Sequence, residues 1–176
     1  MKGELEMPNW CEGSLGIRGT KENVLKFLKE GFERYTCNVK THKNELVPGD
    51  IFAFDGEDDD TIYVLVEDVP ATWVYIKGTT RAFFDEEQCG YYTQVRTKDN
   101  IATCRIPIKQ AWGYREEDWL NIALQYDLDL ILYGIECGME FIQEFKIVRG
   151  KISAVTYDDR NTGNWLWDCP FPWMGG

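Results

Sequence analysis

The sequence predicts an α+β fold, a ferredoxin-like sandwich in which two helices lie on one face of a mainly antiparallel sheet. Three observations lead to this prediction. A strand pattern followed by a capped helix occupies residues 14–31, a second strand, helix and strand follow from residue 101, and a hairpin signal stands at Arg149-Gly150. Because each predicted helix has a single apolar stripe and lies between strands, both helices should pack on the same sheet.

The first strand–helix unit has clear start and stop signals. Leu15 and Ile17 alternate with small or polar residues over 14–19, as in a half-buried strand. Thr20 can accept hydrogen bonds from the free amides of a first helical turn, so we expect a helix to begin there. Apolar side chains then recur every three or four residues, and Gly31 predicts the helix end because glycine readily adopts the left-handed conformation.

The second unit repeats this order. Residues 101–108 alternate, although Pro107 lacks an amide hydrogen and favours a sheet edge or a bulge. A helix is predicted at about 115–126, and three acidic residues, 116–118, suit its positively polarised first turn. Further strands are predicted at 128–135, 139–148 and 151–157.

The segment between the units, residues 36–100, predicts a β meander inserted into the sandwich. Short strands are predicted at 51–54, 61–66, 72–76 and 91–96. A dense acidic loop occupies 55–60, and 97–100 forms a hairpin turn. Because no Pro-, Gly- or Ser-rich linker isolates the insertion, we expect residues 1–176 to form a single domain.

The charge of the chain is strongly negative. It contains 30 acidic and 19 basic residues, which gives a formal net charge of −11. Nucleic-acid binding through a general basic surface needs clustered Lys and Arg, so we expect no direct contact with nucleic acid. An acidic chain suits instead a basic protein surface, including one that normally holds nucleic acid. Neither a secretory pattern nor a long apolar run occurs, which predicts a cytoplasmic protein without a membrane span.

The cysteines predict no cofactor. Six of them lie far apart along the chain, none forms a Cys-x-x-Cys pair, and His42 is the single histidine. A structural zinc site usually needs closely spaced ligands, so we expect reduced, mostly buried thiols. A zinc site assembled from distant cysteines is the alternative.

Two segments have a recognisable pattern. The first is Pro8-Asn9-Trp10-Cys11, followed by the strand end Ile17-Arg18-Gly19 and a helix. The second is 129–150, where the turn Glu136-Cys137-Gly138 leads to an aromatic strand and a hairpin. Together they resemble the YubB-like ferredoxin-fold family of phages and plasmids, with a departure from the family pattern at Met139-Glu140. The resemblance covers about half the chain. It implies the ferredoxin-like fold and a mobile-element origin, and it supplies no catalytic residues.

An acidic segment is the first candidate binding surface. From Asp55 to Asp68 the chain has seven acidic residues and no Lys or Arg. The candidate residues are Asp55, Glu57, Asp58, Asp59, Asp60, Glu67 and Asp68. A patch of one sign steers association toward positive surfaces. Calcium binding and simple solvation are the alternatives, although the spacing is not that of an EF-hand loop.

The aromatic C-terminal segment, residues 164–173, is the second candidate surface. Trp165, Trp167 and Trp173 are predicted to contact a partner, because tryptophan is enriched at protein interfaces. The alternative is that the segment packs back on its own domain.

These observations favour a non-enzymatic binding protein. Nothing in the sequence places a base beside Cys11, and the helix dipole already explains the acidic residues 116–118. We expect the chain to inhibit a host defence nuclease, such as a CRISPR effector, by occupying its positively charged nucleic-acid-binding surface. The alternative is a zinc-dependent or nucleic-acid-processing accessory factor of a mobile element. That alternative predicts a basic groove around Arg81, Arg96, Lys98, Arg105 and Lys109.

Overall fold

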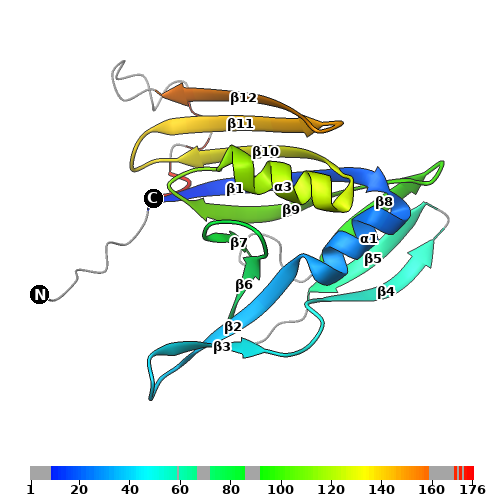
Figure 1. Ribbon diagram of the computed structural model, residues 1–176, viewed down its shortest axis with the longest axis horizontal. Helices are drawn as coiled ribbons and strands as arrows, with labels where there is room; N and C mark the ends of the chain where they lie inside the picture. Colours follow the sequence, from blue (N-terminus) through cyan, green and yellow to red (C-terminus); the bar gives the residue numbers. More distant parts are fainter. Residues whose placement is uncertain are drawn as a thin grey trace, which may run out of the picture.

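A computed structural model describes residues 9–58, 60–66, 72–85, 92–158, 169, 171 and 173–176. Within these residues, twelve strands form one sheet and two helices lie on one of its faces (Figure 1). The first half contains β1 (Trp10–Thr20), α1 (Lys21–Glu30), β2 (Phe32–Asn38), β3 (Lys43–Val47), β4 (Phe52–Asp58), β5 (Thr61–Val66), β6 (Thr72–Ile76) and β7 (Ala82–Phe84). The second half contains β8 (Tyr92–Lys98), β9 (Ile101–Ala111), α3 (Glu116–Tyr126), β10 (Asp129–Glu136), β11 (Phe141–Val148) and β12 (Lys151–Asp158).

The sheet forks at β9. Its main path runs β12-β11-β10-β1-β9-β7-β6-β2-β3, and every pair is antiparallel. One edge of β9 pairs with β1 along all its residues. On the other edge, residues 101–103 pair with β8 and residues 108–110 pair with β7. Because β8 continues through β5 to β4, two separate branches leave the same strand.

Pro107 lies in the gap of this fork. Its carbonyl accepts a hydrogen bond from the amide of Asp85, just after β7, at 3.0 Å. The nitrogen and carbonyl of one strand residue point to the same edge, so the missing amide hydrogen faces away from β1. The side-chain hydroxyl of Thr93 on β8 donates to the carbonyl of Arg105 at 3.1 Å and helps to span the same gap. The proline therefore costs β9 no hydrogen bond to β1, although β9 is central and not an edge strand.

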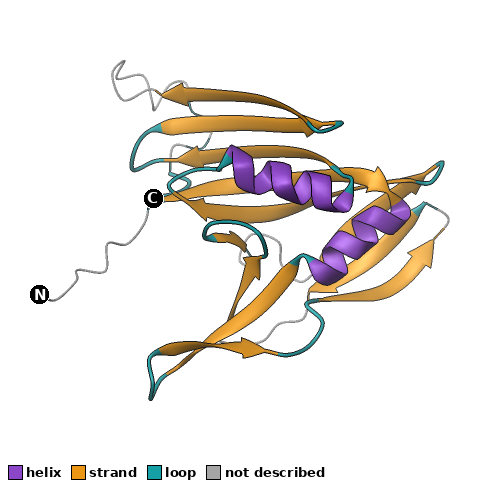
Figure 2. Cartoon of the chain, in the orientation of Figure 1, coloured by secondary structure: helices purple, strands orange, loops and turns teal. Residues whose placement is uncertain are grey.

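The predicted ferredoxin-like sandwich is wrong. Both helices lie close to their predicted positions and on one face, but they cover a small part of a much larger sheet (Figure 2). In a ferredoxin-like sandwich the strand after the first helix would lie beside β9, whereas here β7 and β6 stand between β9 and β2. Periodicity indicates which residues are extended and which face they bury, but it does not choose partners from distant segments. The patterns also failed to predict β2, β3 and β7.

Helix α1 begins and ends where it was predicted, but the conformation of its C-cap residue differs from the prediction. The hydroxyl of Thr20 accepts a hydrogen bond from the amide of Asn23 at 3.2 Å, which confirms the N-cap. Gly31 has a φ of −80°, so its predicted left-handed conformation is wrong. A Cβ on Gly31 would lie 2.6 Å from the ring of Phe27. Close packing against Phe27 therefore explains why residue 31 is a glycine.

A buried polar network holds α3 in place. The Nε1 of Trp119 donates to the Oε1 of Gln110 at 2.8 Å, and both side chains are buried. The Nε2 of Gln110 donates to the carbonyl of Thr80 at 3.1 Å, and the amide of Thr80 donates to Asp118 at 2.6 Å. Since buried polar groups need partners, these bonds fix α3 on β9 and on the turn before β7.

The main hydrophobic core lies between the helices and the sheet. Phe27 and Leu28 of α1 and Trp119 of α3 are buried there against Leu15 and Leu132 of the central strands. None of the described helices is long and apolar enough to cross a lipid bilayer.

Candidate functional site

Among the described residues, the helices cover only one face of the sheet, and we call the other the open face. Leu15 and Ile17 of β1 are buried toward the helices, so Gly16 and Arg18 point to the open face. Side chains of directly paired residues share a face, so Arg105, opposite Gly16 on β9, lies there as well. The strand residues that alternate with the buried ones therefore lie together on the open face.

A cleft of about 680 Å³ is hollowed in this open face. Its polar and basic lining comes from Arg18, Thr93, Gln94, Arg96, Thr103, Arg105 and Asp129, and we call it the arginine cleft. Its volume falls within the range of small-ligand sites, about 300–1,000 Å³. Arg96 and Arg105 are exposed, and neither forms an ion pair within the described part of the chain.

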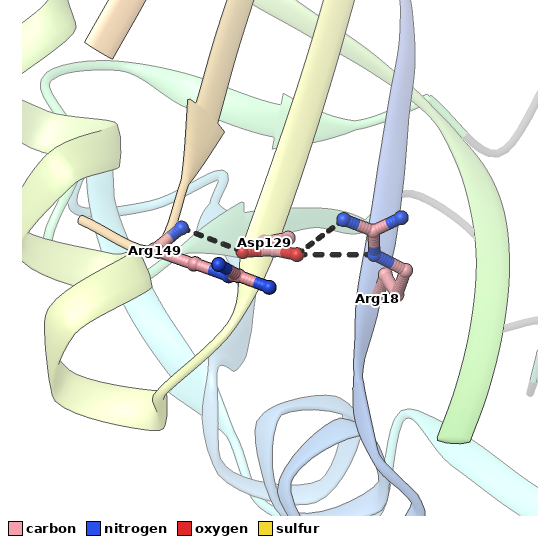
Figure 3. Close-up of polar contacts among 3 residues, drawn as sticks. All are labelled: Arg18, Asp129 and Arg149. Carbon is pink, nitrogen blue, oxygen red and sulfur yellow. Dashed lines mark hydrogen bonds and ion pairs between the residues drawn. The ribbon is translucent and has the colours of Figure 1, made fainter. Parts of the chain in front are cut away.

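Asp129 organises one end of the arginine cleft (Figure 3). Its Oδ2 accepts hydrogen bonds from the Nε and the Nη2 of Arg18, at 3.0 and 2.5 Å. Its Oδ1 accepts from the backbone amide of Arg149 at 2.8 Å. Partial burial raises the pKa of Asp129, but the hydrogen bonds from Arg149 and Arg18 outweigh burial and lower it. The carboxylate therefore stays charged and holds the Arg18 guanidinium at the rim.

Arg105 reaches across β1 near the middle of the cleft. Its Nη1 donates to the hydroxyl of Ser14 at 2.7 Å. A Cβ on Gly16 would lie 3.4 Å from the Nη2 of Arg105, so the glycine leaves room for the guanidinium over the strand. One hydrogen bond to a neutral hydroxyl orients Arg105 and leaves its charge uncompensated.

The charge of the arginine cleft is opposite to that of the chain. Three guanidinium groups line it against one carboxylate, whereas the whole chain has a formal net charge of −11. Arginine presents five donors in a rigid fork that matches carboxylate and phosphate oxygens. The cleft is thus suited chemically to an anionic group.

The sequence predicted this site in part. Arg96 and Arg105 belong to the basic groove of the alternative hypothesis, and the structure brings them together. Arg81 and Lys109 lie elsewhere on the open face, near Trp10, and Lys98 closes β8. Sequence reasoning missed Arg18 and Asp129. The alternation of β1 and β10 could have indicated them, because it places both residues on the polar faces of their strands.

The acidic candidates do not line the arginine cleft, but Asp60 lies next to it, because the amide of Thr97, beside the cleft residue Arg96, donates to the carbonyl of Asp60 at 2.7 Å. Asp55, Glu57 and Asp58 belong to β4, so the backbone of 55–58 is strand and not the predicted loop. Asp60 is exposed in the turn before β5. Asp59, Glu67 and Asp68 lie outside the described residues. Strand β4 pairs with β5 alone among the described strands, so this acidic hairpin ends one branch of the sheet.

The aromatic candidates are described only in part. Trp165 and Trp167 lie outside the described residues. Trp173 is 76% exposed, and its ring centroid is 6.1 Å from that of Phe171. Nearby Cys169 and Met174 pack on Ile135, so part of the segment folds back on the sheet. Figure 1 shows the C-terminus and the tip of the β4–β5 hairpin at opposite ends of the molecule.

The described cysteines form no disulfide, and burial dominates the chemistry of two of them. All five described cysteines are free thiols, and Cys89 lies outside the described residues. Burial, reinforced by the charge of Glu136, raises the pKa of Cys11 far above its ordinary value, and burial raises the pKa of Cys104 to about 12. Both thiols stay protonated near neutral pH, which does not suit a nucleophile. No three His, Cys, Asp or Glu side chains in these ranges group closely enough for a metal ion.

Comparisons with known proteins add no relative. No family model, no curated protein and no solved structure matches the chain. The resemblance to the YubB-like family therefore stays a hypothesis that rests on the residues quoted above.

Proposed function

We propose that this chain is a non-enzymatic binding protein whose arginine cleft holds a phosphate-like anionic group. The observation that carries the proposal is the gathering of Arg18, Arg96 and Arg105 around one cleft, with Asp129 as the single carboxylate among its described lining residues. Arginine pairs gain both energy and geometric specificity when two donors meet two oxygens of an anion.

The three arginines have different roles in this proposal. Asp129 accepts hydrogen bonds from the Nε and the Nη2 of Arg18, so the Nη1 of Arg18 takes no part in this ion pair. Arg105 is oriented by Ser14, and Arg96 faces them from β8. An anion bound between these arginines balances the part of their positive charge that no carboxylate of the described residues balances.

Calorimetric titration with pyrophosphate tests the proposal. The parent should bind, and Arg96→Gln combined with Arg105→Gln should weaken binding about tenfold or more, because two charge-assisted contacts are lost. Lys26→Gln is the matched control, since Lys26 is an exposed cation on α1, on the other face of the sheet. Equal affinity of the double variant and the control would refute the proposal.

A second function is favoured by the acidic hairpin. Under this proposal the chain inhibits a host defence nuclease, such as a CRISPR effector, by occupying its basic nucleic-acid-binding surface. The supporting observation is that four of the acidic residues, Asp55, Glu57, Asp58 and Asp60, lie on a terminal β-hairpin, and its outer strand β4 pairs with no other described strand than β5. We also propose a cytoplasmic location in a host bacterium, which the five free thiols support.

A further inference from the structure

A second group of side chains on the open face consists of aromatic residues. Trp10 of β1, Phe83 of β7, Tyr75 of β6 and Tyr35 of β2 follow one another across four strands. Successive ring centroids are 5.7, 5.8 and 6.5 Å apart. All four residues are half-buried, so each is partly accessible to solvent. We call this group the aromatic row.

Two cations accompany the aromatic row. The guanidinium carbon of Arg81 lies 5.8 Å from the ring centroid of Trp10, and the Nζ of Lys109 lies 6.0 Å from it. Lys109 also pairs with Asp85 at 3.5 Å. Aromatic rings with cations beside them are a common arrangement in proteins that bind single-stranded nucleic acid.

The aromatic row and the arginine cleft lie on the same face of β1 and β9, and Phe171 and Met174 of the C-terminal segment border the stretch between them. β9 carries Arg105 of the cleft, and four residues further on Lys109 is paired with Phe83 of the row. Residues an even number apart share a strand face, and a rise of about 3.4 Å per residue puts the two positions about 14 Å apart. Both positions pair with β1, which runs unbroken from Trp10 to Arg18.

We infer that the ligand of the open face is a single-stranded nucleic acid, with a backbone phosphate in the arginine cleft and unpaired bases on the aromatic row. This inference rests on the proposed anion-binding function and names its ligand. Aromatic rings can stack with bases that are not paired, whereas the bases of a duplex are already stacked on each other. The combination therefore favours a single strand over a duplex.

Acidic groups on the same face set the expected strength of binding. Glu12 accepts a hydrogen bond from the amide of Gly175 at 3.2 Å, Glu33 accepts from the hydroxyl of Tyr35 at 2.8 Å, and Glu144 pairs with Lys146. These carboxylates and the overall charge of the chain oppose a polyanion, which is why net charge predicted no nucleic acid. Binding should be weak and should decrease steeply as salt rises from about 50 mM to about 200 mM.

Fluorescence anisotropy with labelled oligothymidine of about twelve nucleotides tests the inference directly. The full chain should bind the single strand at least about tenfold more tightly than a duplex of the same length. Phe83→Leu keeps an apolar side chain and removes a ring, and it should weaken single-strand binding about fivefold or more while leaving pyrophosphate binding unchanged. Arg105→Gln should weaken both.

A matched control separates ring loss from general damage. Phe54→Leu also removes a half-buried ring with a cation near it, since the Nζ of Lys29 lies 5.0 Å from its centroid, but this ring packs against the helix-side core. It should leave oligothymidine binding unchanged, and circular dichroism should confirm that both variants fold.

Each outcome decides between the two claims. Pyrophosphate binding without tighter oligothymidine binding would overturn the inference and leave the anion site standing. Equal binding of duplex and single strand, or equal effects of Phe83→Leu and Phe54→Leu, would also overturn it. Absence of binding to both probes would overturn the anion site and the inference together.

Discussion

Replacing Asp129 by Asn should lower stability and raise anion affinity at the same time. The substitution removes the one carboxylate that lines the arginine cleft among the described residues. It keeps a single oxygen, which can accept from Arg149 or from Arg18 but not from both, because the two arginines donate to different oxygens of Asp129. The side chain of Arg18 is 55% exposed, so the lost ion pair is screened by solvent. Together with the weakened bond to Arg149, we expect a loss of about 1 kcal/mol in the free energy of unfolding near neutral pH.

The gain in affinity follows from Coulomb's law. A unit charge about 6 Å from a bound anion contributes roughly 0.7–2.8 kcal/mol for an effective dielectric constant between about 80 and about 20. Removal of the Asp129 charge should therefore tighten pyrophosphate binding by about fivefold, or about 1 kcal/mol. A fall in affinity comparable with that of Arg105→Gln, measured by the same titration, would refute the electrostatic account of the cleft.

The pH dependence gives an independent check on Asp129. Its pKa is lowered in the folded chain, so its stabilising contribution is present above the unfolded value of about 4 and is lost as pH falls through the folded pKa. The asparagine does not titrate. Urea unfolding at a series of pH values should show the parent and the variant converging in acid, and a difference that persists unchanged at low pH would contradict the assigned charge role.

Three other perturbations probe the rest of the molecule. Gln110→Ala leaves the Nε1 of Trp119 without its partner in a buried site, and urea unfolding should show a loss of about 2–4 kcal/mol. Changing Asp58, Asp59 and Asp60 together to Asn should leave folding intact. If the inhibitor function holds, stopped-flow measurements should show slower association with a basic partner and a smaller dependence of the association rate on salt. Equal rates of parent and variant across the salt range would show that the acidic hairpin is not part of the binding surface. Thiol titration of the denatured chain under anaerobic conditions should find all six cysteines free, and fewer would indicate a disulfide or a modified thiol.

Local signals in the sequence were sufficient for the helices and for the tight turns. The N-cap at Thr20 is confirmed, and so are the turns at 99–100 and at 149–150, where both residues of each pair have positive φ. These features depend on contacts within a few residues, so their chemistry is visible in a short window. The predicted left-handed Gly31 shows the limit of this approach, because a contact with Phe27 and not the backbone conformation explains that residue.

The fold and the site depend on pairings between distant segments. No local pattern predicts that β9 pairs with one strand along one edge and with two strands along the other. This forked pairing distinguishes the fold from a ferredoxin-like sandwich. Arg18 and Asp129 are 111 positions apart, so their contact exists only once β1 pairs with β10. Net charge was also a poor guide to the open face, since it averages over a chain whose charges are unevenly placed.

The fork at β9 also explains why the arginine cleft exists where it does. β8 pairs with β9 at residues 101–103, so within the described residues the stretch from Cys104 to Pro107 has no paired strand on that edge. Arg105 lies in this gap, and its backbone is held by Thr93 while its side chain is turned to Ser14. A neighbouring strand along the whole edge would place side chains beside Arg105 and fill the hollow that Arg96 lines from β8. The inserted segment 36–100 therefore supplies the strand that leaves β9 and one wall of the proposed binding site.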